Sequence, residues 1–565
     1  MTGLPAISDR AELPPRYYLG HFESLLAHVE ALYPGLLTLA EVAFIDGFRD
    51  LSEPTRCLYV RLINRRPDFF RVRRLDYPEI PDRDAALAEL QRAGLVEPLT
   101  PAHADELAAV LALFTRAELR RRVALPKVPG KPALLERLAA EQGPALLDVL
   151  GEPVVRRRGM DRVRVLKLLY FGTLHRDMDQ FVIRDLGRVR FEPVDPQALT
   201  PYFRTRAQVE TRLAIHEARL RFDRDGDPEA LAAGYRDWHA GLGLPDPLVA
   251  PSLDRLTLRV ARRVERAGAR EPALQLYDLT DRPPARERRV RLLTGLGRTT
   301  EAGTLCERIA ATAQSAAEAG FARDWLARRT GVRRRAVTRL LAAADTLTLD
   351  PVWRSRVEQG VLEAYRGRGW DGFFAENRLW RGLFGLLFWD MLFDPAAGAL
   401  HHPLQRAPSD LFRPEFLARR REAIAQRLRR LDDTAVLRGS LGVMAAAKRG
   451  IDNPLVVWSE ALLERIERVC TLLRPEQLRA VLLLMAENLS ANGSGFPDLL
   501  VWRANEYAFV EVKSPTDQLA EQQRFWLERF RELGIPARLL RVRWANAASA
   551  AAAVPSTAGR DSGST

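Results

Sequence analysis

Lysine is scarce in this sequence. Only five of its 565 residues are lysines, although lysine and arginine together number 86. Nearly every positive charge is therefore an arginine, a bias that GC-rich coding produces. Arginine also suits phosphate groups, because its planar guanidinium donates two parallel hydrogen bonds. Since lysine is so uncommon here, its positions carry information: they are Lys127, Lys131, Lys167, Lys448 and Lys513.

Cysteines, histidines and long apolar runs are also few. Cys57, Cys306 and Cys470 are isolated, which excludes a disulfide framework and indicates a reducing cytoplasm. The beginning of the sequence lacks the basic and then apolar segment of a signal peptide. The most apolar stretch, residues 382–393, is too short to span a bilayer. The eight histidines show no HExxH or other metal-binding spacing. We therefore expect a cytoplasmic protein without a membrane partner.

The charge balance favours a polyanionic partner. There are 86 basic and 73 acidic residues, a formal net charge of +13, and the sequence pI is about 10.0. Such an excess points to nucleic acid or to an anionic membrane surface. The apolar share of 47% and the charged share of 28% are those of an ordinary globular protein. At about 150 residues per domain, this length predicts three to four domains.

The chain is predicted to be multidomain and mostly α-helical, with a C-terminal α/β domain. Residues 1–100 combine helices, basic residues and a short strand, which resembles a winged helix; a solvated basic face is the alternative. Thr115 is a suitable N-cap for a short helix, and a basic turn around Lys127 and Lys131 leads into a second helix. This pair resembles a SAP-type DNA-binding module, although a plain helical hairpin would look the same.

Short helices then recur at the length of a TPR repeat from about residue 250. The segments we expect are an N-terminal DNA-binding region (1–100), a SAP-like module (101–150), a helical linker (151–249), TPR-like repeats (250–369), an α/β domain (370–545) and a disordered tail (546–565). Arginine clusters lie at residues 61–74, 156–164, 286–291 and 419–430. Taken alone, each cluster fits a solvated helix face better than a binding site. Taken together, the clusters predict an extended phosphate-binding surface.

The clearest chemical motif lies near the C-terminus. Pro497-Asp498 opens an apolar strand, and after 12 intervening residues Glu511-Val512-Lys513 ends a second one. The polar residues 503–506 suit a hairpin turn between the two strands. Because side chains alternate along a strand, Glu511 and Lys513 share a face, and pairing of the strands brings Asp498 to the same end. Asp517 is expected to cap a helix over residues 518–533, and residues 537–541 are predicted to form another strand.

These residue types suit metal-dependent phosphodiester hydrolysis. Two neighbouring carboxylates repel each other unless a cation neutralises them, and hard oxygen ligands suit Mg²⁺ or Mn²⁺. The carbonyl group of Val512 can add a ligand. Lys513 would stand beside the attacking water or the scissile phosphate and stabilise developing negative charge. The alternative is a surface hairpin with a solvated Glu–Lys pair, which would not require the preceding Pro-Asp.

The spacing is the signature of the PD-(D/E)XK nuclease superfamily. The sequences GFPDLLVW (495–502) and FVEVKSPTDQLAEQQRFWL (509–527) resemble its VRR-NUC branch. The upstream stretch AENRLWRGLFGLLFWD (375–390) resembles the Fanconi-associated nuclease family, in which a metal-binding glutamate on a helix stands nine residues before GLLFWD; Glu376 occupies that position. The SAP-like and TPR-like segments follow in that family's order. The chain is thus similar to a bacterial member of the family.

The resemblance implies a structure-specific DNA nuclease, a 5′-flap endonuclease with 5′-to-3′ exonuclease activity in interstrand crosslink repair. It implies that Glu376, Asp498, Glu511 and the carbonyl of Val512 bind Mg²⁺ or Mn²⁺, and that Lys513 is the catalytic lysine. Asp517 and Gln523 match further motif positions. Vertebrate members carry a lysine that binds a 5′ phosphate where this sequence has Gln522. A Holliday-junction or restriction-type nuclease and a non-catalytic DNA-binding scaffold remain alternatives, and protein partners are not indicated.

Overall fold

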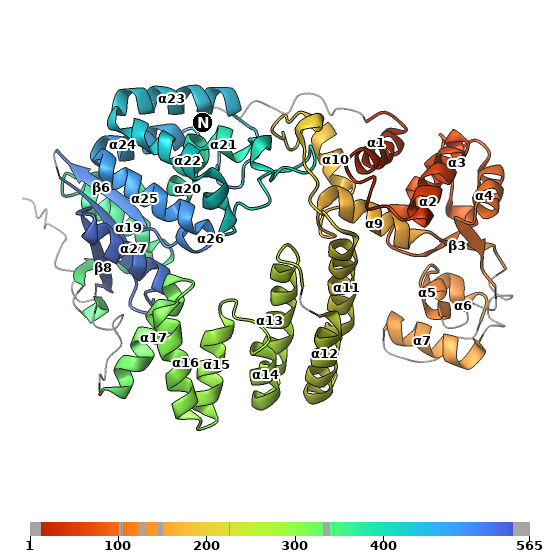
Figure 1. Ribbon diagram of the computed structural model, residues 1–565, viewed down its shortest axis with the longest axis horizontal. Helices are drawn as coiled ribbons and strands as arrows, with labels where there is room; N and C mark the ends of the chain where they lie inside the picture. Colours follow the sequence, from red (N-terminus) through yellow and green to blue (C-terminus); the bar gives the residue numbers. More distant parts are fainter. Residues whose placement is uncertain are drawn as a thin grey trace, which may run out of the picture. The chain divides into compact units, whose positions relative to one another are not determined.

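The computed structural model divides into two compact units (Figure 1). The first comprises residues 1–216 and 401–404, and the second comprises residues 217–400 and 405–565. The structure describes residues 13–545 except 101–102, 104–105, 124–129, 144–150, 225, 244, 332–339, 343 and 505. The predicted tail at 546–565 and the predicted basic turn at Lys127 lie outside the described residues.

The first unit starts with helices and a small antiparallel sheet. The helices are α1 (Tyr17–Leu32), α2 (Leu39–Arg49), α3 (Glu53–Ile63) and α4 (Arg83–Arg92), and the strands are β1 (Phe69–Arg71), β2 (Val96–Pro98) and β3 (Val154–Arg157). The sheet order is β1-β3-β2, so a strand from beyond residue 150 lies between two strands from the first hundred residues. Residues 99–153 are therefore an insertion between β2 and β3, and the boundary expected at residue 100 does not separate two independent sheets.

Arg157 shows why β3 belongs there. Its guanidinium donates to the carbonyl oxygens of Leu62 and Arg65, both at 2.6 Å, and pairs with Asp68 at 2.8 Å. Charge-assisted bonds of this kind are stronger than neutral ones, and here they tie β3 to the end of α3.

The insertion holds α5 (Leu107–Leu111), α6 (Arg116–Arg120) and α7 (Lys131–Gln142). Thr115 caps α6 as expected: its Oγ1 accepts from the N–H of Glu118 at 3.2 Å, and the Glu118 carboxylate accepts from the N–H of Thr115 at 2.8 Å. Lys131 Nζ donates to the carbonyl oxygen of Ala112 at 3.1 Å, so this lysine holds the start of α7 against the end of α5. Beyond β3 follow α9 (Met160–Phe171), α10 (Asp179–Asp185) and α11 (Arg206–Phe222).

The second unit begins with an array of short helices, as the sequence predicted from residue 250 on. They are α12 (Pro228–Leu242), α13 (Ala250–Arg266), α14 (Arg270–Tyr277), α15 (Ala285–Gly295), α16 (Thr299–Ala311) and α17 (Ala316–Arg329), and each packs against the next (Figure 1). In α13, Leu253, Leu256, Val260 and Val264 are buried at helical spacing. The array is thus built from amphipathic helices that bury one face each.

A five-stranded mixed sheet follows in the same unit. Its strands are β4 (Asp345–Leu349), β5 (Asp371–Phe374), β6 (Leu499–Arg503), β7 (Glu506–Lys513) and β8 (Ala537–Trp544), in the order β4-β8-β7-β6-β5. The predicted hairpin is β6–β7, and it is antiparallel with Leu499 opposite Val510. The predicted third strand is β8, which runs parallel to β7.

The sheet starts earlier in the chain than expected. Strand β4 pairs in parallel with β8, although it lies before the predicted domain boundary at residue 370. Leu347 and Leu349 of β4 alternate with exposed residues and join the same apolar core as Val510 and Val542. That boundary therefore falls inside the α/β domain, which takes in residues from 345.

Helices cover both faces of this sheet. Helix α19 (Val357–Arg366) buries Val361 and Leu362 against the side chains of Leu499, Val501, Val510 and Val512. On the other face, Phe509 contacts Trp380 of α20 (Asn377–Leu387) and Phe530 of α27 (Glu521–Glu532). The fold is thus mostly helical with a C-terminal α/β domain, as predicted.

The remaining helices are α21 (Trp389–Leu392), α22 (Glu415–Arg429), α23 (Thr434–Lys448), α24 (Leu462–Leu472), α25 (Pro475–Glu487) and α26 (Leu489–Asn492). Within the described ranges, no helix is long and apolar enough to cross a membrane.

Candidate active site

A tightly packed loop, residues 495–497, positions Asp498 at the edge of the sheet. The ring of Phe496 stacks on Trp380, with the ring centroids 4.9 Å apart, and on Trp526, with the centroids 4.1 Å apart. Gly495 has a φ of +89°, and a Cβ added there would lie 2.6 Å from the Cβ of Gln522. Only glycine fits both this backbone conformation and this close approach to α27. The loop therefore fixes where the Pro-Asp step enters β6.

Asn377, which the sequence analysis did not single out, links this loop to Glu376. Its side-chain Oδ1 accepts from the N–H of Gly495 at 2.7 Å and from the N–H of Phe496 at 3.3 Å. Its Nδ2 donates to Glu376 Oε1 at 3.1 Å. A single amide thus positions both the loop before Asp498 and a predicted metal ligand.

The hairpin brings Asp498 to the end of β7. Asp498 Oδ2 accepts from the backbone N–H of Val512 at 2.7 Å. Glu511 and Lys513 share a face, as predicted, and Lys513 Nζ lies 2.7 Å from Glu511 Oε1. The side chain of Val512 points the other way, into the apolar core under α19. The two acids and the lysine thus meet at the carboxyl end of β7.

Glu376 reaches the site through β5 rather than from within a helix. It is the N-cap residue of α20 and is exposed, whereas the sequence analysis expected it on the helix itself. Strand β5 pairs with β6, and this pairing extends to the N–H of Ala375, which donates to the carbonyl oxygen of Asp498 at 2.8 Å. Sheet pairing therefore places Glu376 one residue beyond a direct partner of Asp498.

Burial and mutual repulsion make these carboxyl groups unusual acids. The side chain of Glu511 is 0% exposed, and burial, followed by the charge of Asp498, raises its pKa to about 8 although Lys513 opposes the shift. Burial likewise raises the pKa of Asp498 to about 6, against the opposing bond from Val512. The charge of Glu376 raises the pKa of both groups. Such shifts cluster at functional sites.

A fourth carboxylate faces the site. Glu358, in the first turn of α19, is partly buried, and its charge also raises the pKa of Asp498. Glu358 could not be found from the sequence motif, because α19 precedes the motif by more than a hundred residues and carries no motif of its own. The only feature of the sequence that could have pointed to Glu358 is the presence of an acidic residue in the first turn of a helix.

The donor set suits a hard divalent cation. Glu511 Oε2 is buried without a hydrogen-bond partner in the described part of the chain, a costly state for a carboxylate oxygen. All the side-chain donors here are carboxylate oxygens, which Mg²⁺ and Mn²⁺ prefer. As the side chains lie, no group of three or more His, Cys, Asp or Glu among the described residues is arranged so that it could hold a metal ion. Metal binding by these residues therefore stays a prediction.

The residues after the motif support the loop to α27. Asp517 Oδ2 accepts from the N–H of Ser514 at 2.9 Å, so it closes a turn directly after β7. Helix α27 begins at Glu521 rather than at residue 518, and Gln523 Oε1 accepts from the N–H of Ala520 at 3.0 Å. The cap predicted for Asp517 is thus supplied by Gln523, while Asp517 holds the preceding turn.

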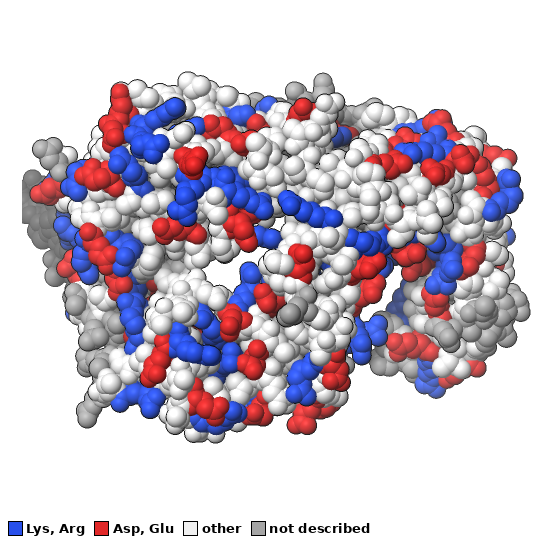
Figure 2. Space-filling model, in the orientation of Figure 1, with Lys and Arg blue, Asp and Glu red and all other residues white. Residues whose placement is uncertain are grey.

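Each of the predicted arginine clusters contains one arginine that is buried inside the protein. Arg286 is buried and pairs with Glu318 at 2.6 Å, and Arg420 is buried and pairs with Asp410 at 2.9 Å. Buried Arg71 pairs with Glu118 and Glu152. Figure 2 shows Lys and Arg side chains interspersed with Asp and Glu on the visible face. Each cluster therefore contributes one arginine to internal ion pairs, while its other arginines are exposed or partly buried.

Comparisons with known proteins agree with this architecture. The VRR-NUC domain model matches residues 441–544, and the model named "FAN1, HTH domain" matches residues 16–97. The Fanconi-associated nuclease 1 homolog of Pseudomonas aeruginosa is 34% identical over 545 residues, which are 94% of this chain and 96% of that protein. The Arabidopsis thaliana homolog is 25% identical over 96% of this chain and 68% of its own.

A solved structure is similar over nearly the whole chain. The crystal structure of paFAN1 bound to DNA with a two-nucleotide 5′ flap and a gap superimposes with a TM-score of 0.82 at 32% identity. The match covers 95% of this chain and 100% of that one. With a relative of this identity matched almost end to end, the chain belongs to the Fanconi-associated nuclease family.

Proposed function

We propose that this nuclease cuts DNA at 5′ flaps, digests it in the 5′-to-3′ direction and acts in the repair of interstrand crosslinks. Family membership supports DNA cleavage, and the similar solved structures are described as bound to 5′-flap DNA. The observation that carries the proposal is the buried Glu511: its Oε2 has no hydrogen-bond partner among the described residues, and its Oε1 lies 2.7 Å from Lys513 Nζ. We further propose that the protein works on the chromosome in the bacterial cytoplasm.

Each residue of the site has a proposed role. Glu376, Asp498, Glu511 and the carbonyl of Val512 would hold Mg²⁺ or Mn²⁺, which when bound polarises the phosphate and acidifies water. The N–H of Val512 orients the Asp498 carboxylate toward the end of β7. The Lys513 ammonium group, held by Glu511, stabilises negative charge that develops on the phosphate oxygens.

The test is cleavage of labelled DNA structures with and without chelator. We expect cleavage of a 5′-flap substrate that requires Mg²⁺ or Mn²⁺, with slower cleavage of a four-way junction and of plain duplex. Asp498→Ala, Glu511→Ala and Lys513→Ala should each lower the rate by at least about a hundredfold while DNA affinity is retained. Glu506→Ala is the matched control, because Glu506 is an exposed glutamate on the same strand.

Three results would contradict the proposal. Normal turnover by the Lys513→Ala variant would show that Lys513 has no catalytic role. Equal rates on flap and on plain duplex would favour a restriction-type nuclease, and faster cleavage of the four-way junction would favour a Holliday-junction nuclease.

A further inference from the structure

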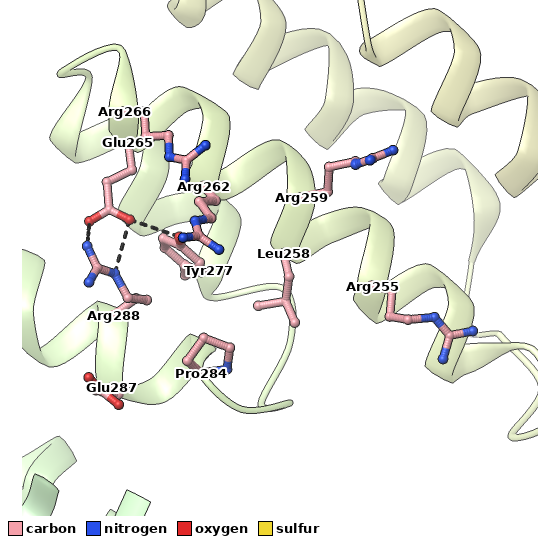
Figure 3. Close-up of a pocket in the computed structure, with 10 residues that line it drawn as sticks. All are labelled: Arg255, Leu258, Arg259, Arg262, Glu265, Arg266, Tyr277, Pro284, Glu287 and Arg288. Carbon is pink, nitrogen blue, oxygen red and sulfur yellow. Dashed lines mark hydrogen bonds and ion pairs between the residues drawn. The ribbon is translucent and has the colours of Figure 1, made fainter. Parts of the chain in front are cut away.

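A second basic feature of this unit lies away from the carboxylate site. Helices α13, α14 and α15 enclose a groove of about 670 Å³ that is lined by ten residues (Figure 3). Five of the ten are arginines, two are glutamates and one is an aromatic residue. We call it the arginine groove; its arginines are Arg255, Arg259, Arg262, Arg266 and Arg288.

Four of these arginines form a row along α13. Positions 255, 259, 262 and 266 recur at intervals of four, three and four residues, so they share one face of the helix. All four are exposed, whereas the opposite face of α13 is buried. With a rise of 1.5 Å per residue, the row extends over about 16 Å. One strand of B-DNA presents about five phosphates over that length.

Carboxylates neutralise only part of this row: Arg259 pairs with Asp223 at 3.1 Å, and the acids of the groove itself have other partners. Glu265 pairs with Arg288 and accepts from the Tyr277 hydroxyl at 2.9 Å (Figure 3). Glu287 pairs with Arg291 at 2.8 Å. In the part of the chain that the structure describes, Arg262 and Arg266 pair with no carboxylate. Exposed and uncompensated guanidinium groups in a concave surface raise the local concentration of anions.

We propose that the arginine groove binds the phosphate backbone of a duplex arm of the DNA substrate. This inference rests on the proposed function and adds a binding surface on the helical array to the cleavage site. Base stacking of a single strand needs exposed aromatic rings, and the one aromatic residue of the groove, Tyr277, is only 2% exposed. Guanidinium groups in a row instead match successive phosphates without reading sequence.

The experiment measures binding of fluorescent flap DNA by anisotropy, in chelator and over a range of salt concentrations. The test variant is Arg262→Glu with Arg266→Glu. The matched control is Arg308→Glu with Arg368→Glu, which makes the same change in net charge at exposed arginines outside the groove. Arg262→Lys with Arg266→Lys keeps the charge, and circular dichroism and thermal melting check folding of every variant.

We expect the test variant to bind flap DNA about tenfold more weakly than the control variant. The slope of log K against log salt should fall by about two, since two phosphate contacts are lost. The lysine variant should retain most of the slope, and kcat at saturating DNA should stay unchanged. Equal affinity and equal slope in the test and control variants would overturn the inference.

Two further outcomes are distinguishable. If a fluorescent oligoglutamate peptide binds and is lost with the test variant while DNA binding is unaffected, the groove is a peptide site and the inference is wrong. If the wild type cuts no DNA with metal but the test variant still loses DNA affinity, the proposed function fails and the groove stands.

Discussion

Metal binding should release about one proton at pH 7, because Glu511 must lose a proton before its oxygens can hold a cation. With a pKa of about 8, Glu511 is about 90% protonated at pH 7, and Asp498, with a pKa of about 6, is about 10% protonated. The total is about one proton per protein. At pH 9 both groups are largely ionised, and the total falls to about a tenth of a proton.

Calorimetry measures this number directly. Mn²⁺ is titrated into chelator-treated and dialysed protein in two buffers of different ionisation enthalpy, and the difference in heat gives the protons released. The Glu511→Gln variant should release about a tenth of a proton at pH 7, whereas Glu506→Gln should behave as the wild type. Proton release near zero at pH 7, or release unchanged in Glu511→Gln, would refute the assignment of the buried acid as the group that titrates.

Three further predictions follow from the same geometry. In chelator, the folded protein keeps a proton on Glu511 that the unfolded chain gives up above pH 4.5. The melting temperature should therefore fall as pH rises from about 5 to about 8. The Glu511→Gln variant should show a weaker dependence of its melting temperature on pH. Gly495→Ala should lower the free energy of unfolding by about 2 kcal/mol or more in denaturant, because the φ of Gly495 is +89° and the new Cβ would meet Gln522. Gly442→Ala, which has open space around it, should not lower the free energy of unfolding. Equal stability of the two variants would contradict the packing argument. Asn377→Ala removes the bonds to Gly495 and Glu376, so kcat on flap DNA should fall about tenfold with DNA affinity unchanged, and a normal kcat would deny its positioning role.

The hairpin could be predicted from the sequence because its information is local. Strand alternation places Glu511 and Lys513 on one face, and a polar turn between two apolar runs sets the antiparallel pairing that delivers Asp498. Glu376 came only from a resemblance, since its position depends on β5, which pairs with a strand more than a hundred residues later. Strand β4 was missed for the same reason: it is short and finds its partner, β8, far along the chain.

Charge was the least reliable guide, because a guanidinium group reads the same in the sequence whether its partner is a carboxylate or a phosphate. Arg286, Arg420 and Arg71 stand in dense basic runs, yet each is buried against an acid that lies outside its own run.

The row on α13 shows the opposite case. Its arginines alternate with buried residues at helical spacing and therefore look like an ordinary amphipathic helix, yet Arg262 and Arg266 are left without an acidic partner in the described chain. Neither the rarity of lysine nor its burial identified the site by itself. Lys513 and Lys167 are both 7% exposed, but Lys513 lies beside a fully buried glutamate, whereas Lys167 pairs with Asp177, which is largely exposed, at 2.6 Å. What marks the active site is thus not a rare residue but a buried glutamate and lysine that lie close to further carboxylates, more than one lysine can neutralise.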